Sequence, residues 1–338
     1  MRADVFGSRD KMAANIESFR EWVPIRIYTR DSEPFVDWCY AGSARFTEPF
    51  FNDTIQRILR RPFSVLFRHQ TQLDFLRELE TECPGLDPTG FIFHMSRCGS
   101  TLVAQMLAAV TKNIVISEAP PIDSIVRYRG ATADSRRDAL KWMVGALGQP
   151  RSGCEKYYFI KFDSWNILDL DVIRSAFPNV PWIFLYRDPV EVIVSQMRQR
   201  GSHMVPGAIK HSLPDLGLEA ALQMSPEEYC ARILGRICES AAAPAMDPNS
   251  LLVNYDQLPD AVGDLILPHF NVSFDADQIR QMYEAAQFNA KTPQMFFEPD
   301  CESKRSEASD TVRQNAEKWV VPIYERLEEL RRDRLVKL

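Results

Sequence analysis

Long apolar runs are missing from this sequence of 338 residues. No stretch reaches about 18 consecutive apolar residues, the length that a membrane-spanning helix requires. The first 20 residues also lack the apolar core of a secretory signal. Internal repeats and low-complexity tracts are missing as well. We therefore expect a globular, cytoplasmic protein that does not have a membrane as a partner.

Paired cysteines are also missing. The seven Cys residues are scattered and odd in number, and no C-x-x-C pair occurs among them. This pattern favours reduced thiols over a disulfide framework or a zinc site. No other cluster of metal-ligating residues stands out, so we expect a site without metal.

An excess of basic residues is missing too, because the formal net charge is −6. A negative field does not favour binding of a polyanion such as DNA, so we expect no nucleic-acid partner. A small anionic ligand would have to be held by a local cluster of Arg and Lys side chains.

What the sequence does contain is a series of short apolar strands that alternate with helical segments. This alternation is typical of an α/β fold with a mostly parallel central sheet and helices on both faces. We assign it to a domain of residues 89–338, preceded by an N-terminal extension of residues 1–88. The predicted strands of the sheet are residues 91–93, 113–117, 157–162, 181–186 and 251–254.

One stretch, GFIFHMSRCGSTLVAQML at residues 90–107, joins a strand, a small polar loop and a helix. This order is typical of an anion site, because the first amides of a helix have no intrahelical partner. Gly99 lets a ligand approach the backbone closely, and Ser100 and Thr101 add hydroxyl donors. Arg97 adds a planar guanidinium that suits phosphate or sulfate. The alternative is an ordinary strand-to-helix turn capped by Ser and Thr.

The same loop is not a Walker A sequence. That motif needs a Lys directly after its last Gly, and Gly99 is followed by Ser100. The loop can therefore bind an anion, but it lacks the Lys expected of an ATPase.

Two charged residues stand near the ends of the next predicted strands. Glu118 follows residues 113–117, and the carboxyl edge of a parallel sheet is where such folds place their sites. Glu118 is therefore a candidate general base; the alternatives are a solvated surface Glu or a helix cap. Lys161 lies in the apolar run YYFIKF, where a buried ammonium is costly unless it meets an anion. It could also face water on an edge.

A second strand-to-helix junction reads YRDPVEVIVS. Arg187 ends the strand and Ser195 follows eight positions later, about two helical turns along. Both can reach one phosphate if the helix begins close to Arg187. The alternative for Ser195 is a buried hydroxyl that bonds to its own helix backbone.

Beyond this junction, three segments have weaker patterns. Residues 201–221, which include His203 and His211, are predicted to be an irregular, mobile loop over the site. Residues 301–306, CESKRS, are predicted to be a basic loop, and residues 310–335 a single last helix.

Taken together, these motifs resemble the sulfotransferase family that uses 3′-phosphoadenosine 5′-phosphosulfate (PAPS). SRCGSTL at residues 96–102 is similar to the 5′-phosphosulfate loop of that family, and YRDPVEVIVS is similar to its 3′-phosphate motif. The two motifs occur in this order, about 90 residues apart, each after an apolar strand. Glu118 and Lys161 resemble the base and the Lys of the tyrosylprotein branch. Residues 253–258, VNYDQL, resemble the late strand and turn of the family.

The sequence departs from the family pattern at three points. Cys98 stands where a Ser is usual, so one hydroxyl donor is missing. His94 stands where a Gly is common and is either a packed strand-end residue or a second acid/base group. There is no clear C-terminal Arg-Lys-Gly motif, and Lys304 or Arg305 is the candidate substitute.

The resemblance implies a fold like that of P-loop nucleoside triphosphatases. It also implies transfer of a sulfuryl group from PAPS, with 3′-phosphoadenosine 5′-phosphate (PAP) as product. The acceptor would be a hydroxyl or amine of a small molecule or peptide. Residues 1–88 resemble no element of the family, and we expect them to act as a lid or on the acceptor side. The implied site has catalytic residues Glu118, Lys161 and Arg97 and cofactor-binding residues Arg97, Cys98, Gly99, Ser100, Thr101, Arg187, Ser195, Tyr255 and Lys304.

Two other functions stay open at this point. One is a protein of the same fold that binds the nucleotide without catalysing transfer, which the departures at Cys98 and His94 suggest. The other is a P-loop kinase that uses ATP and Mg²⁺, against which the missing Walker Lys argues.

Overall fold

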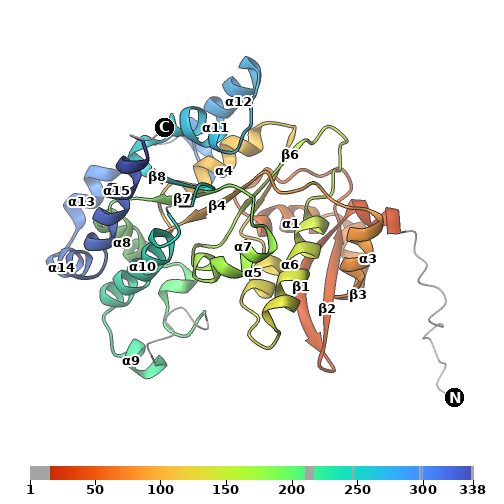
Figure 1. The fold of residues 1–338 in the computed structure, drawn as a ribbon, viewed down its shortest axis with the longest axis horizontal. Helices are drawn as coiled ribbons and strands as arrows, with labels where there is room; N and C mark the ends of the chain where they lie inside the picture. The colour runs from red at the N-terminus through yellow and green to blue at the C-terminus, as the bar shows by residue number, and fades with distance from the viewer. Residues whose placement is uncertain (1–15, 210–216, 246, 297, 299, 336–338) are drawn as a thin grey trace.

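A five-stranded parallel sheet forms the centre of the molecule (Figure 1). The computed structural model describes residues 16–209, 217–245, 247–296, 298 and 300–335. The strand order is β5-β6-β4-β7-β8, and all four pairings are parallel. The strands are β4 Gly90–His94, β5 Asn113–Ser117, β6 Tyr157–Lys161, β7 Trp182–Tyr186 and β8 Ser250–Asn254.

Burial explains why these strands read as continuous apolar runs. Every residue of β4, β5, β7 and β8 is buried, as expected for a sheet covered on both faces. Figure 1 shows α4 and α12 on one side of the sheet and α7 and α10 on the other. The predicted α/β class is confirmed, and each strand bound lies within one residue of its prediction. The helices that follow the strands are α4 Ser100–Ala109, α5 Pro120–Val126, α6 Ala133–Leu147, α7 Leu170–Ala176, α8 Pro189–Arg198, α10 Pro226–Ala242 and α12 Ala276–Ala286.

The strand order places β4 at the point where successive strands switch from one side of the sheet to the other. The chain leaves β4 for β5, passes through β6 and then crosses β4 to reach β7. In such sheets, ligands bind outside the carboxyl ends of the strands at this switch point. The loop after β4 and the residues that end β5, β7 and β8 therefore share one edge of the sheet.

Residues before β4 form a small antiparallel sheet with its own helices. Strands β1, β2 and β3 pair in that order, and the sheet packs against α5 and α6. Its buried side chains join those of the central sheet in one continuous core. The division at residue 88 stays a prediction. The elements are β1 Trp22–Arg30, β2 Glu33–Tyr40, α1 Phe51–Leu59, α2 Pro62–Leu66, β3 Arg68–Gln72 and α3 Phe75–Glu82.

Strand β3 was not visible in the sequence. Its segment, RHQTQ, is polar, and only Thr71 is buried. It is an edge strand that pairs with β2 through backbone hydrogen bonds and polar side-chain contacts, such as Gln70 Nε2 with Asp37 Oδ1, so no apolar alternation indicates it.

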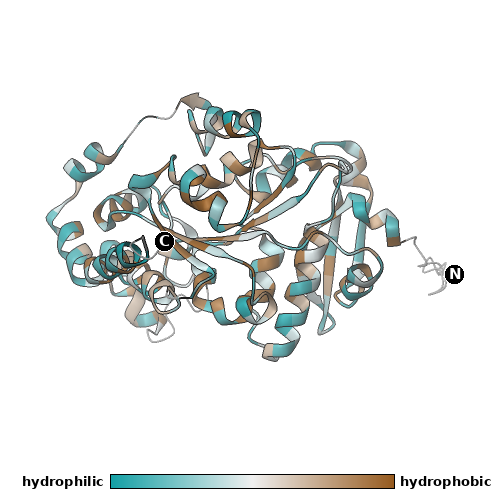
Figure 2. Ribbon diagram, turned by 45° about the horizontal axis from the view of Figure 1, so that its top comes forward, coloured by the Kyte–Doolittle hydropathy of each residue, from teal (hydrophilic) through white to brown (hydrophobic). Residues whose placement is uncertain are grey.

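The C-terminal region departs from two predictions. Residues 301–306, predicted to be a loop, lie in helix α13 Cys301–Glu307, which packs on α8. The predicted single helix over residues 310–335 is two helices, α14 Asp310–Trp319 and α15 Val321–Leu335. The break precedes Pro322, which fits only the first turn of a helix because it has no backbone N–H. Figure 2 shows that these helices are largely hydrophilic.

Two further segments bear on the site. A hairpin of β9 Phe288–Asn289 and β10 Thr292–Phe296 follows α12. The predicted irregular segment 201–221 contains a short 3₁₀ turn, Ser202–Met204, and helix α9 Leu218–Leu222. His211 lies outside the described residues. Among the described helices, none is both long enough and apolar enough to cross a bilayer.

Candidate functional site

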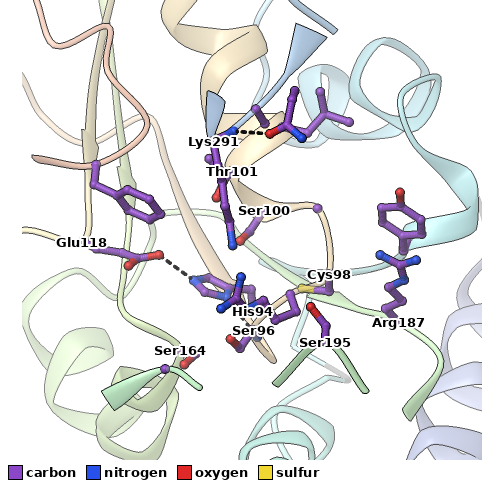
Figure 3. A pocket seen from close by; sticks show the side chains of 18 of the residues that line it. His94, Ser96, Cys98, Ser100, Thr101, Glu118, Ser164, Arg187, Ser195 and Lys291 are labelled. Carbon is purple, nitrogen blue, oxygen red and sulfur yellow. Dashed lines mark hydrogen bonds and ion pairs between the residues drawn. The ribbon is translucent and has the colours of Figure 1, made fainter. Parts of the chain in front are cut away.

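A cavity of about 430 Å³ opens at the carboxyl edge of the central sheet. It is bounded by the loop after β4 and by residues that follow β5, β7 and β8 (Figure 3). Of the predicted site residues, Lys161 does not line this cavity. Those that do are Arg97, Cys98, Gly99, Ser100, Thr101, Glu118, Arg187, Ser195, Tyr255 and Lys304.

The loop after β4 has an unusual backbone. Ser96, Arg97 and Gly99 have φ values of 80°, 52° and 83°. A Cβ on Gly99 would lie 2.6 Å from Leu258 Cδ1 and 2.9 Å from Tyr255 Cδ2, so only Gly fits there. Successive amides in such a left-handed turn form a concave nest that suits an anion.

Side chains hold this backbone in place. The backbone N–H of Ser96 donates to His94 Nδ1 at 3.1 Å, and Gln196 Nε2 donates to Ser96 Oγ at 2.9 Å. Arg97 Nη2 donates to the carbonyl oxygen of Gln199 at 2.6 Å, which ties the loop to the end of α8. The loop is therefore preorganised by protein contacts.

The start of α4 supplies hydrogen-bond donors to the cavity. Ser100 and Thr101 are both largely buried, and neither hydroxyl has a hydrogen-bond partner among the described residues. No side chain caps this helix. Free amides and hydroxyls at a helix N-terminus favour a bound anion.

Cys98 contributes only its backbone to this end of the cavity. Its thiol donates to the carbonyl oxygen of Leu185 on β7 at 3.1 Å. Burial raises the pKa of the Cys98 thiol to about 11, so the group stays protonated. The side chain at this position is directed at the sheet, and the exchange of Ser for Cys therefore removes no donor from the cavity.

Glu118 is an ionised carboxylate at the side of the cavity. It follows β5 with a φ of 55°, and its side chain is 23% exposed. Burial alone would raise the pKa of this carboxyl, but the ion pair with Lys161 and the contact with His94 hold it well below its usual range. The carboxylate can therefore accept a proton throughout the neutral pH range.

Lys161 lies behind Glu118 rather than beside the cavity. It is fully buried, its ammonium pairs with Glu118, and its Nζ lies 5.2 Å from the centre of the Phe50 ring. Lys161 therefore does not line the cavity, although the family resemblance implied that it is a catalytic residue. A buried ammonium needs an anion, and Glu118 at the end of the neighbouring strand supplies it.

His94 has both ring nitrogens engaged. Nδ1 accepts from the backbone N–H of Ser96, so the proton lies on Nε2, which donates to the carbonyl oxygen of Phe162 at 3.1 Å. Nε2 is also 3.5 Å from Glu118 Oε1 (Figure 3). Burial lowers the pKa of His94, so the ring is neutral. This geometry favours a packed, orienting residue over a second acid/base group.

Arg187 anchors the opposite end of the cavity. Its side chain is 5% exposed and pairs with Glu191 Oε2 at 2.6 Å and Asp300 Oδ1 at 3.0 Å. Its guanidinium carbon lies 3.9 Å from the centre of the Tyr255 ring. Figure 3 shows Ser195 beside it, on the far side of the loop from Glu118.

Asp300 joins this arginine to a second cation. Its Oδ2 lies 2.7 Å from Lys304 Nζ, while its Oδ1 contacts Arg187. An internal carboxylate thus sits between the two cations expected to bind a phosphate. Arg305 instead contacts Glu191 Oε1 at 2.8 Å and does not line the cavity, so Lys304 is the cation that does.

Sequence reasoning missed several residues that line the cavity. His203 was assigned only to a loop; its Nε2 lies 3.3 Å from Ser164 Oγ, and burial lowers its pKa to about 4. No motif indicated the others, since they come from elements without a charged or small-residue pattern. The missed residues include Phe50, Ser164, Trp165, His203, Phe288 and Lys291. Among the residues that the structure describes, no group of three or more His, Cys, Asp or Glu side chains is placed to hold a metal ion.

No protein-family model matches the chain, and no curated protein sequence matches it. Several solved structures do. The sulfotransferase domain of the curacin biosynthetic pathway is 16% identical, with a TM-score of 0.43, over 69% of this chain and 98% of that one. A sulfotransferase from Mycobacterium avium is 12% identical, with a TM-score of 0.43, over 72% of this chain and 81% of that one. Retinol dehydratase in a complex with retinol and PAP is 15% identical, with a TM-score of 0.38, over 75% of this chain and 87% of that one. Because these likenesses are distant, a functional argument rests on the residues of the site.

Proposed function

We propose that the protein transfers a sulfuryl group from PAPS to a hydroxyl or amine of a small molecule or peptide. The observation that carries the proposal is the meeting of two motifs in one cavity. The loop of residues 96–101 and the pair Arg187 and Ser195 are about 90 residues apart in the sequence and line the same space. A donor with phosphate groups at both ends of its ribose needs two such anion sites at opposite ends of one cavity.

The loop end suits the 5′-phosphosulfate. Helix amides and the hydroxyls of Ser100 and Thr101 are free to donate to its oxygens, and Arg97 adds a positive charge. Arg187, Ser195 and Lys304 suit the 3′-phosphate at the other end. PAP, which carries both phosphates, would bridge the two.

The reaction that this arrangement supports is an in-line displacement at sulfur. The acceptor oxygen or nitrogen forms a bond to sulfur while the bond from sulfur to the bridging oxygen breaks. PAP leaves with that electron pair, and the acceptor proton passes to Glu118. Positioning and stabilisation of developing charge supply most of the acceleration, as in phosphoryl transfer.

The low pKa of Glu118 fits a late proton transfer. A weakly basic carboxylate cannot remove a proton from a free alcohol to a useful extent, but the acceptor oxygen becomes acidic once it bonds to sulfur. Lys161 keeps the carboxylate ionised, and His94 orients it. On this account Lys161 acts through Glu118 and does not touch the donor.

The direct test is an assay of PAP formation from PAPS with a panel of phenols, aliphatic alcohols and amines. We expect PAP to accumulate together with a sulfated acceptor, and mass spectrometry identifies both products. ATP with Mg²⁺ replaces PAPS in a parallel reaction. A phosphorylated acceptor in that reaction, with no product from PAPS, would make the protein a kinase and overturn the proposal.

Replacing Asp300 with Asn is expected to strengthen PAP binding roughly fivefold, or about 1 kcal/mol, as typical of a partly exposed ion pair. The Asp300 carboxylate occupies the space between Arg187 and Lys304 and would compete with the 3′-phosphate. Calorimetric titration measures the change. Adenosine 5′-phosphate (AMP) is the control, since it has no 3′-phosphate and its affinity should not move. Weaker PAP binding would mean that Asp300 orients the two cations instead of competing.

A further inference from the structure

One cation at the cavity belongs to no motif. Lys291 lies at the tip of the β9–β10 hairpin and lines the cavity beside the loop that follows β4. Figure 3 shows its side chain extending from the hairpin into the cavity, toward the loop. Among the described residues, no carboxylate forms an ion pair with its ammonium. Lys291 is therefore a cation that extends into the cavity without a carboxylate partner among the described residues, and an anionic ligand could supply one.

The hairpin is positioned by the helix that the loop itself begins. Helix α12 packs against α4, and β9 follows α12 directly. At the tip, Asn289 Oδ1 accepts from the backbone N–H groups of Lys291 and Thr292, at 3.0 and 3.1 Å. These contacts fix the backbone of Lys291 relative to the loop, although the residue itself is solvent-exposed.

The charges around Lys291 indicate what it would bind. The groups that act on it are Arg97 and Cys98 of the loop, Lys161 of β6 and Glu118 after β5. Lys161 and Glu118 neutralise each other, and the Cys98 thiol is uncharged. Arg97 and Lys291 therefore remain as two positive charges at this end of the cavity. A 5′-phosphosulfate carries two negative charges, one on the phosphate and one on the sulfate.

We propose that Lys291 is a catalytic residue that extends from the β9–β10 hairpin and contacts the non-bridging oxygens of the transferring sulfuryl group beside the loop. This inference rests on the proposed function and adds to it a residue that the sequence motifs do not contain. The loop lacks the Lys of a Walker A sequence, and the hairpin supplies one from elsewhere in the chain. In the reaction, Lys291 stays protonated: the acceptor proton passes to Glu118, and PAP leaves with the electrons of the broken bond.

The protonation state of Lys291 gives this contact a pH dependence. Although the residue as a whole is solvent-exposed, desolvation of its ammonium at the cavity, together with Arg97 and Lys161, lowers the pKa of Lys291 to about 8, while Glu118 opposes the shift. The ammonium is needed to bind the sulfuryl oxygens, so kcat/KM for PAPS should fall as pH rises above about 8. A bound donor adds negative charge and raises this pKa, so kcat should fall only at higher pH.

The test compares Lys291→Met and Lys291→Arg with the wild type. A single charge contact that strengthens in the transition state is worth about 10²- to 10³-fold in kcat, which is the loss expected for Lys291→Met. PAP, which has no sulfuryl group, should bind this variant nearly as well as the wild type. Lys291→Arg should keep much of the activity and lose the alkaline decline, because its guanidinium does not deprotonate in that range. Lys141→Met, at an exposed position on α6 outside the cavity, is the matched control and should change nothing.

The outcomes separate this inference from the proposed function. If the wild type forms no product from PAPS, the proposed function fails and the role of Lys291 fails with it. If the wild type is active and Lys291→Met is equally active, the inference alone is wrong. It is also wrong if Lys291→Arg keeps the same alkaline decline, since another group would then be titrating.

Discussion

Replacing Glu118 with Gln is expected to slow sulfuryl transfer by about 10²- to 10⁴-fold, the usual contribution of a general base. The amide keeps the size of the side chain but cannot accept the acceptor proton. PAP binding should change little, because Glu118 lies beside the loop and not among its anion donors. Single-turnover rates with PAPS, measured beside PAP affinity, separate the two effects.

This variant needs a control for folding. Glu118 is the anion partner of the fully buried Lys161, and removing one partner of a buried pair typically costs about 3–5 kcal/mol. The double variant Glu118→Gln/Lys161→Met removes both charges and should recover much of that stability in thermal unfolding. It should stay inactive. Transfer at the wild-type rate by either folded variant would show that Glu118 is not the base.

Replacing Arg187 with Ala is expected to weaken PAP binding by about 10- to 100-fold, since hydrogen bonds to charged groups are worth about 1.5–3 kcal/mol. The affinity for AMP should stay nearly constant, because AMP has no group for Arg187 to hold. Glu191 loses one partner but keeps its contact with Arg305 at 2.8 Å, which limits the structural damage.

Arg187→Lys is the matched variant for this site. It keeps the charge and loses the planar fork, so it should fall between the wild type and Arg187→Ala. The measurement is calorimetric titration of each protein with PAP and with AMP. An equal loss of affinity for both nucleotides would assign Arg187 a structural role and would remove the argument for a 3′-phosphate.

The features that the sequence indicated correctly are those that depend on local pattern. Buried parallel strands read as apolar runs, so the sheet and its carboxyl edge could be predicted. The approach of a ligand to the backbone at Gly99 stays a prediction, while the crowding by Leu258 and Tyr255 shows that the position has no room for a Cβ. Arg187 follows β7 directly and Ser195 lies in the next helix, α8, and both line the cavity as their spacing predicts.

Side-chain direction and long-range packing could not be predicted in the same way. Lys161 is near the end of its strand, as expected, but the sequence does not show that the neighbouring Glu118 pairs with its ammonium and that Lys161 stays out of the cavity lining. Lys291 reaches the loop because α12 packs on α4, a contact between segments far apart in the sequence. Helix α13 has no apolar periodicity and is held against α8, so CESKRS alone indicated a loop.

The central claim is that the cavity binds a nucleotide with phosphates at both the 5′ and the 3′ positions. Calorimetric titration of the wild type with PAP, with AMP and with adenosine 2′,5′-bisphosphate tests it most directly. The account predicts that PAP binds at least about tenfold more tightly than either of the others. The 2′,5′ isomer has the same charge, so a preference for PAP reports the position of the phosphate. Equal affinity for PAP and AMP, or no binding of PAP, would contradict the account.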